Sequence, residues 1–83
     1  MDKFLCAYVT SKFDVKTGKP SYIGTYDRET LAKAAARQAV PKSVIIDYWQ
    51  VSPHNENLFT AYYSNLKTHE DIRVAQIQRV VIR

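Results

Sequence analysis

The stretch DRETLAKAAARQAVP, residues 27–41, decides the fold class, because its composition favours a helix more strongly than any other part of the chain. Alanine, leucine, lysine and arginine have the highest helix propensities. Asp27 suits the N-cap, since its carboxylate can accept a hydrogen bond from a free backbone N–H, and Pro41 cannot continue a helix. We therefore predict a helix over residues 28–40. Its packed face is expected to contain Leu31, Ala34, Ala35, Gln38 and Ala39.

Residues with high strand propensity precede this helix. Residues 4–13 are apolar on both faces if extended, which is typical of a central strand covered on two sides. Gly18 and Pro20 mark a turn, and residues 21–26 are again β-branched and aromatic. These segments predict a β-hairpin with a basic loop.

After the helix, residues 43–51 and 58–64 predict two strands joined by a polar turn. The last segment allows two interpretations. Thr68 and Asp71 could form a capping box that opens a helix, whereas the β-branched residues of 72–82 favour a strand. With a strand there, the fold class is α+β: one domain, residues 1–83, with a mostly antiparallel sheet and one helix packed on it, in the order β-β-α-β-β-β.

The composition limits the class of protein. A chain of 83 residues with 46% hydrophobic residues can form one small core. No apolar run approaches the roughly 20 residues of a membrane span, and the N-terminus lacks the pattern of a signal peptide. The single cysteine, Cys6, cannot form an internal disulfide. We therefore expect a cytoplasmic domain without a membrane partner.

Residues that could support catalysis are sparse and badly spaced. His54 and His69 stand in separate polar segments, so neither a zinc site nor a histidine-based triad is expected. The only two glycines do not form a phosphate-binding loop. Asp47 interrupts an apolar segment, and we expect its carboxylate to bond a cross-strand Arg or Tyr hydroxyl, or to face solvent on an edge strand. The sequence predicts a non-enzymatic protein with no metal and no cofactor.

The charge is unevenly placed, and this predicts a binding surface. The net charge is +4, and all of the excess lies in residues 1–42, which hold eight Lys or Arg and four Asp or Glu. Such asymmetry favours a polyanion or an acidic protein surface as partner, although solubility alone would also explain it. Arg73, Arg79 and Arg83 would share one side of an extended last strand. Tyr62 and Tyr63 would point to opposite faces, and Tyr48 is expected in the core or half-buried. The candidate partner-binding residues are Lys12, Lys16, Lys19, Tyr22, Lys33, Arg37, Tyr62, Arg73 and Arg79.

A resemblance adds a specific expectation about the partner. The Ala-rich helix AKAAARQ, residues 32–38, and the aromatic strand NLFTAYY, residues 57–63, resemble the layout of small phage-encoded anti-CRISPR proteins that inhibit type I Cascade surveillance complexes. The resemblance implies binding to protein subunits of such a CRISPR-Cas complex in a bacterial cytoplasm, which would block DNA engagement or cleavage. A basic chain cannot mimic a DNA duplex.

Two other functions stay open on the sequence. Basic side chains and seven Tyr or Trp rings would also suit a small nucleic-acid-binding module. A thin core and several strand edges allow either a monomer or a homodimer, as in a structural or oligomerising protein.

Overall fold

The computed structural model describes residues 5–65 and 67–82, and it is an α+β fold with one five-stranded antiparallel sheet. The order along the chain is β-β-α-β-β-β, as predicted. The spatial order of the strands is β2-β1-β5-β4-β3. The elements are β1 (Leu5–Phe13), β2 (Pro20–Tyr26), α1 (Glu29–Ala39), β3 (Tyr48–Ser52), β4 (Asn55–Asn65) and β5 (Glu70–Ile82).

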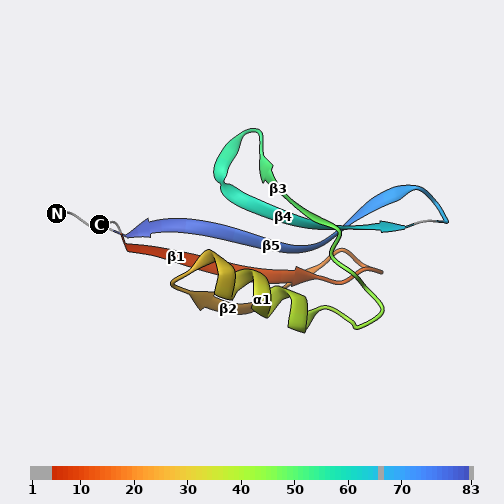
Figure 1. Ribbon diagram of the computed structural model, residues 1–83, viewed down its shortest axis with the longest axis horizontal. Helices are drawn as coiled ribbons and strands as arrows, with labels where there is room; N and C mark the ends of the chain where they lie inside the picture. Colours follow the sequence, from red (N-terminus) through yellow and green to blue (C-terminus); the bar gives the residue numbers. More distant parts are fainter. Residues whose placement is uncertain (1–4, 66, 83) are drawn as a thin grey trace.

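The last strand occupies the middle of the sheet and joins its two halves (Figure 1). One part of β5, up to Ile82, pairs with β1, and the part from Glu70 to Gln78 pairs with β4. The strand interpretation of this segment is therefore confirmed over the helix. β-Branched side chains pack well on the pleated surface of a sheet, whereas in a helix they would lose rotamer freedom.

Helix α1 lies on one face of the sheet, against β1, β2 and β5 (Figure 1). Its buried residues are Ala32 and Ala36, so the predicted packed face was wrong: Leu31, Ala34 and Gln38 are exposed. Small side chains four residues apart let the helix backbone approach the strands closely. The N-cap is Arg28, without a side-chain capping bond, and not Asp27 as predicted.

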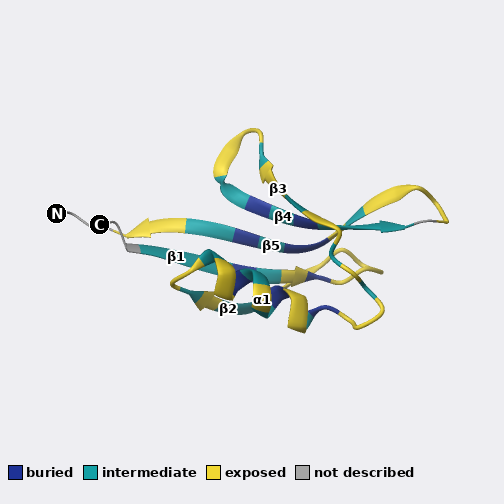
Figure 2. Cartoon of the chain, viewed as in Figure 1, coloured by how far each residue is buried: buried dark blue, intermediate teal, exposed yellow. Residues whose placement is uncertain are grey.

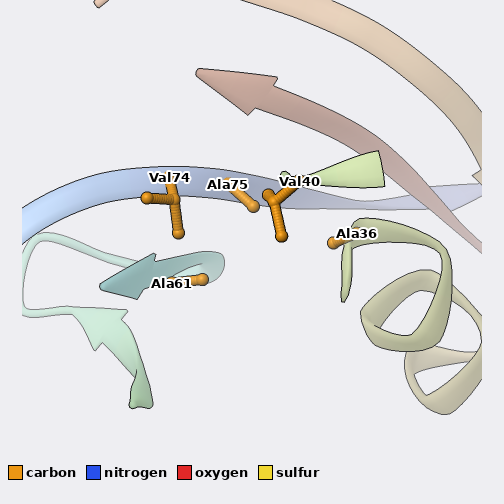
Figure 3. Close-up of a cluster of buried hydrophobic side chains, with 5 residues drawn as sticks. All are labelled: Ala36, Val40, Ala61, Val74 and Ala75. Carbon is orange, nitrogen blue, oxygen red and sulfur yellow. The ribbon is translucent and has the colours of Figure 1, made fainter. Parts of the chain in front are cut away.

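A β-bulge in β5 builds the first core cluster. Ala61 pairs with Ala75 but Tyr62 pairs with Arg73, so β5 has one extra residue, Val74, at this point. Neighbouring residues of a regular strand point to opposite faces, whereas a bulge can turn two of them to the same side. Val74 and Ala75 both point to the helix side and are fully buried (Figure 3). The buried members of this cluster are Ala36, Val40, Ala61, Val74 and Ala75.

The second core cluster lies nearer the start of the helix. Ile77 is fully buried and packs with Ala32 and Phe59. Partly buried aromatic rings surround these three residues, among them Trp49, which also contacts the first cluster. Both clusters lie on the helix side of the sheet, and Figure 2 shows the buried parts of β4, β5 and α1 in dark blue. The expectation that the first strand would be covered on two sides was therefore wrong: β1 is internal in the sheet, but the helix covers only one of its faces.

The segment between helix and β3 also differs from the prediction. Residues 43–47 were expected to be strand, but β3 begins only at Tyr48. Val44 and Ile46 pack partly buried against the first core cluster, while Ile45 between them is exposed. Burial therefore alternates along this segment as it would in a strand, but the segment is a loop that covers the core.

Candidate functional site

The face of the sheet opposite the helix is the candidate binding surface, and we call it the open face. Residues that are directly paired across strands point to the same side, so the strand registers assign its members. In the middle of the sheet the pairs run through all five strands. This middle row contains only uncharged hydrogen-bonding side chains: Tyr22, Ser11, Gln76, Thr60 and Gln50.

A row of aromatic rings and one guanidinium group lies beside the middle row. The guanidinium carbon of Arg73 is 4.1 Å from the ring centroid of Phe13. Arg73 pairs with Tyr62 across the β4–β5 ladder, and the rings of Tyr62 and Tyr48 stack with centroids 5.2 Å apart and planes at 22°. Phe13 is buried, whereas Arg73 and Tyr48 are exposed. We call Phe13, Arg73, Tyr62 and Tyr48 the aromatic row.

A small hydrogen-bond network fixes the outer end of the aromatic row. The Tyr48 hydroxyl donates to Oδ2 of Asp71 at 2.8 Å, and the Ser64 hydroxyl donates to Oδ1 at 2.8 Å. These two bonds, the one from Tyr48 first, hold the pKa of the Asp71 carboxyl below its ordinary value. The same bond raises the pKa of the Tyr48 hydroxyl. The network orients the Tyr48 ring against Tyr62.

Replacing Tyr48 with phenylalanine should therefore change the acid sensitivity of the fold. A depressed carboxyl pKa contributes stability that is present above the unfolded pKa, about 3.9, and is lost as the pH falls through the lower folded value. We expect Tyr48→Phe to be less stable than the parent protein at pH 7. The difference should shrink as the pH falls below about 4.

Urea unfolding between pH 7 and pH 2.5, followed by the fluorescence of Trp49, measures this difference. Tyr63→Phe is the matched control, because Tyr63 packs against the first core cluster on the helix side. A difference for Tyr48→Phe that stays constant down to pH 2.5 would contradict the role given to Asp71.

Cations gather where the β1–β2 turn meets the end of the helix, and we call this region the basic end. Lys12 Nζ lies 3.5 Å from the carbonyl oxygen of Ala39, which ties the β1 end to the last helical turn. Lys12 and Pro41 line one hollow of about 260 Å³, and Pro41 also lines a neighbouring hollow with Arg37 and Lys42. The basic end contains Lys12, Lys16, Lys19, Arg37 and Lys42.

The one carboxylate inside the turn, Asp14, is occupied by the turn itself. Its Oδ1 accepts hydrogen bonds from the backbone N–H of Lys16 at 2.8 Å and of Thr17 at 3.0 Å. These bonds, the one from Thr17 first, lower the pKa of Asp14. Gly18 takes the positive φ of 72° that closes the turn. The turn thus holds Lys16 and Lys19 on a defined loop, with both side chains exposed.

Seven of the nine predicted contact residues belong to the basic end, the aromatic row or the middle row. Phe13 connects the aromatic row with the basic end, because it belongs to the aromatic row and also lines the hollow between Lys12 and Pro41. The residues of the two parts nevertheless face different ways: Tyr22, Tyr62 and Arg73 lie on the open face. Lys12 is on the helix side of β1, and Arg37 is on the helix. The seven residues are Lys12, Lys16, Lys19, Tyr22, Arg37, Tyr62 and Arg73.

The other two predicted residues lie elsewhere and have local partners. Lys33 forms a salt bridge of 3.3 Å with Glu29, and its ammonium group lies over the ring of Trp49. Arg79 donates from Nε to Asn57 at 2.9 Å. Arg79 pairs with Tyr8 on the helix side, so the expectation that Arg73 and Arg79 share one side was wrong. The bulge at Val74 reverses the alternation between them. Arg83 lies outside the described residues.

Sequence reasoning missed Tyr48 and Phe13. Tyr48 was expected in the core or half-buried, yet it is 40% exposed because β3 is an edge strand. The prediction that Tyr62 and Tyr63 point to opposite faces is confirmed by the contacts of Tyr62 with Tyr48 and of Tyr63 with the core. The available signal was that Tyr48 and Trp49 are adjacent, so in a strand only one of the two rings can point to the helix side.

The described residues offer little for bond-making chemistry. Within residues 5–65 and 67–82, no three His, Cys, Asp or Glu side chains come together as metal ligands. Asp47 lies in an open hollow of about 690 Å³, but its Oδ2 already accepts the backbone N–H of Ser64 at 2.6 Å. This partner is a cross-strand backbone group rather than an Arg or Tyr side chain. His54 and His69 stand in the turns of two different hairpins.

Helix α1 is too short and too polar to cross a membrane, and it is the only helix in the described part of the chain. No protein-family model, curated protein or solved structure matches this chain.

Proposed function

We propose that this chain is a non-catalytic binding protein that holds single-stranded nucleic acid against its open face. The observation that carries the proposal is the aromatic row beside the basic end. Aromatic rings and arginine planes stack on bases of any sequence, and lysines neutralise the phosphates that link those bases. Both kinds of group stand at the same end of the sheet.

The charges indicate how a strand would run. Asp71 lies at the Tyr48 end of the aromatic row, and the lysines of the turn lie at the Phe13 end. The phosphates should therefore lie near Arg73, Lys16 and Lys19 and away from the negative carboxylate of Asp71, which would repel them. The bases would then reach the exposed rings and the amide and hydroxyl groups of the middle row. In a duplex the faces of the bases are stacked on one another, so a single strand is the better ligand.

Fluorescence anisotropy with a labelled 12-nucleotide single strand, measured between 50 and 200 mM salt, tests this proposal. We expect saturable binding. The logarithm of the association constant should fall linearly with the logarithm of the salt concentration, with a slope of about −0.7 for each phosphate contact. The double variant Lys16→Ala/Lys19→Ala should lower the slope by about 1.4 if both lysines contact phosphates.

Lys33→Ala is the matched control, because Lys33 is paired with Glu29 and lies outside the basic end. It removes the same kind of charge, yet the slope should hardly change. The absence of any anisotropy change at 50 mM salt would remove the proposal, and so would tighter binding to the matching duplex.

The resemblance to anti-CRISPR proteins predicts a different partner, a type I Cascade complex. The uncharged middle row favours this second candidate, because hydroxyl and amide groups without charges suit a protein surface as well as base edges. Its test is co-elution with a purified type I Cascade on size exclusion at 150 mM salt. A stoichiometric complex that forms without binding to free single strands would support the inhibitor. Failure to co-elute with any type I complex would remove it.

A further inference from the structure

The two edges of the sheet differ in how they are protected. On β2, Pro20 lacks a backbone N–H and stands at the start of the strand, and a bulge interrupts the ladder with β1 opposite Thr10 and Ser11. Proline and bulges are devices that prevent edge pairing. On β3 the five residues YWQVS contain neither proline nor any charge, and the register shifts only at the last residue, Ser52. The β3 edge is therefore the one open to another strand.

The side chains of β3 carry apolar surface that the chain itself leaves uncovered. Val51 is 48% exposed and Tyr48 is 40% exposed. Trp49 is half-buried under Lys33, and its indole Nε1 is buried without a hydrogen-bond partner among the described residues. A strand added beside β3 would cover Val51 and the outer side of Trp49, which is apolar surface of the kind that drives association.

We infer that β3 is a dimerisation edge, and that the occupant is the β3 strand of a second copy in antiparallel orientation, centred on Gln50. This register is self-complementary. Trp49 of each copy stands opposite Val51 of the other on the helix side, an aromatic and β-branched pair that stabilises sheets. The two Gln50 amides meet on the open face, where each can donate to the other. Tyr48 stands opposite Ser52.

The distribution of charge allows this approach. The protein carries +4 overall, and a second copy would be repelled at the basic end. At the β3 edge no charged side chain stands within residues 48–52, so every directly opposed pair in this register is neutral. Lysine on an edge strand is a common protection against such pairing, and residues 48–52 contain none. The lysine over Trp49, Lys33, belongs to the helix, and its charge is paired with Glu29.

Dimerisation would extend the open face. The middle row ends at Gln50, so pairing of the two Gln50 residues continues it into the second copy and makes one ten-stranded sheet. A contact made mainly by two five-residue strands is small, below the roughly 1,200 Å² of stable interfaces. The dimer should therefore dissociate in the micromolar range, and its population should depend on concentration.

Sedimentation equilibrium without any ligand tests the inference from about 5 to 500 µM protein. The parent mass should rise from 9.6 kDa toward twice that value. Gln50→Lys and Gln50→Glu should each stay near 9.6 kDa, because like charges would be directly opposed. An equimolar mixture of the two variants should recover the dimer. A parent that is monomeric at 500 µM, or a Gln50→Lys variant that dimerises as well as the parent, would overturn the inference.

A crosslinking measurement keeps the test independent of any effect of charge on folding. In a Cys6→Ser background, Gln50→Cys should form an intermolecular disulfide under mild oxidation, since directly opposed Cβ atoms of a non-hydrogen-bonded pair lie about 4.5–5.5 Å apart. Thr25→Cys on the β2 edge is the matched control and should crosslink at least tenfold more slowly. Equal rates at the two edges would overturn the inference. No nucleic acid takes part, so the result is independent of the proposed function.

Discussion

Replacing Ile77 with alanine should lower the free energy of unfolding by about 2–5 kcal/mol. Among the described side chains, Ile77 is the largest that is completely buried, and it packs against Ala32 of the helix and Phe59 of β4. The side chain of Ala32 on the helix is too small to move into the cavity that a shorter residue at position 77 would leave. The cost should therefore include both the lost transfer energy and the cavity.

The effect should be large relative to the whole stability of the domain. A domain of this size has roughly 5 kcal/mol of stability, because it buries only about 60% of its unfolded surface. Ile77→Ala should thus be partly unfolded at 37 °C, with a urea midpoint far below that of the parent. The fluorescence of Trp49, which touches the same cluster, reports the transition.

Val80→Ala is the matched control for this prediction. Val80 lies three residues further along β5 and is 43% exposed, so its truncation should cost no more than about 1 kcal/mol. Equal losses for Ile77→Ala and Val80→Ala would show that strand propensity, rather than the buried cluster, determines the stability of β5.

Replacing Arg73 with alanine should weaken binding of a single strand by about 1–3 kcal/mol, roughly 5- to 150-fold. Arg73 is the one exposed cation of the aromatic row, and it lies between Phe13 and Tyr62. Its guanidinium can stack on a base and at the same time neutralise a phosphate. Loss of one phosphate contact should also lower the salt slope by about 0.7.

Two further variants separate these contributions. Arg73→Lys keeps the positive charge but loses the planar guanidinium group that can stack on a base. The salt slope should therefore be retained, while the affinity at a fixed salt concentration falls. Arg79→Ala removes an equal charge from the other half of β5, on the helix side, and should bind almost as the parent does. If Arg73→Ala and Arg79→Ala weaken binding equally, the aromatic row has no special role. The thermal midpoint of each variant must be compared as well, because Arg73 covers Phe13.

Local signals predicted most of the fold. The helix of 29–39 follows from an alanine-rich segment, and the first hairpin follows from Gly18 and Pro20. The packed face of the helix did not follow: alanines stand on several sides of the helix, and Leu31, which the sequence places on the packed face, is exposed. Only contact with the sheet selects Ala32 and Ala36. Residues 43–47 predict a strand because they are rich in β-branched residues, but in the structure they form a loop whose Val44 and Ile46 cover the core.

The candidate site was harder to predict than the fold, for a reason of register. The lysines of the first turn are neighbours in sequence, so their grouping could be foreseen. The stacking of Tyr48 on Tyr62 and the position of Arg73 depend on how three strands align, and a bulge shifts that alignment by one residue. One extra residue, Val74, moves Arg73 to the open face and leaves Arg79 on the other. Local sequence alone did not reveal where the strand would bulge.

The central place of β5 has a consequence for how the molecule assembles. Leu5 pairs with Ile82, and β1 and β4 have no ladder with each other, so the two halves of the sheet stay separate until the last strand inserts between them. Contacts between residues so distant in sequence raise the contact order, and such chains fold in milliseconds to seconds rather than microseconds. During synthesis the strand edges of β1 and β4 that later pair with β5 stay unpaired until β5 has been made. In that state, chaperone binding and aggregation compete with folding.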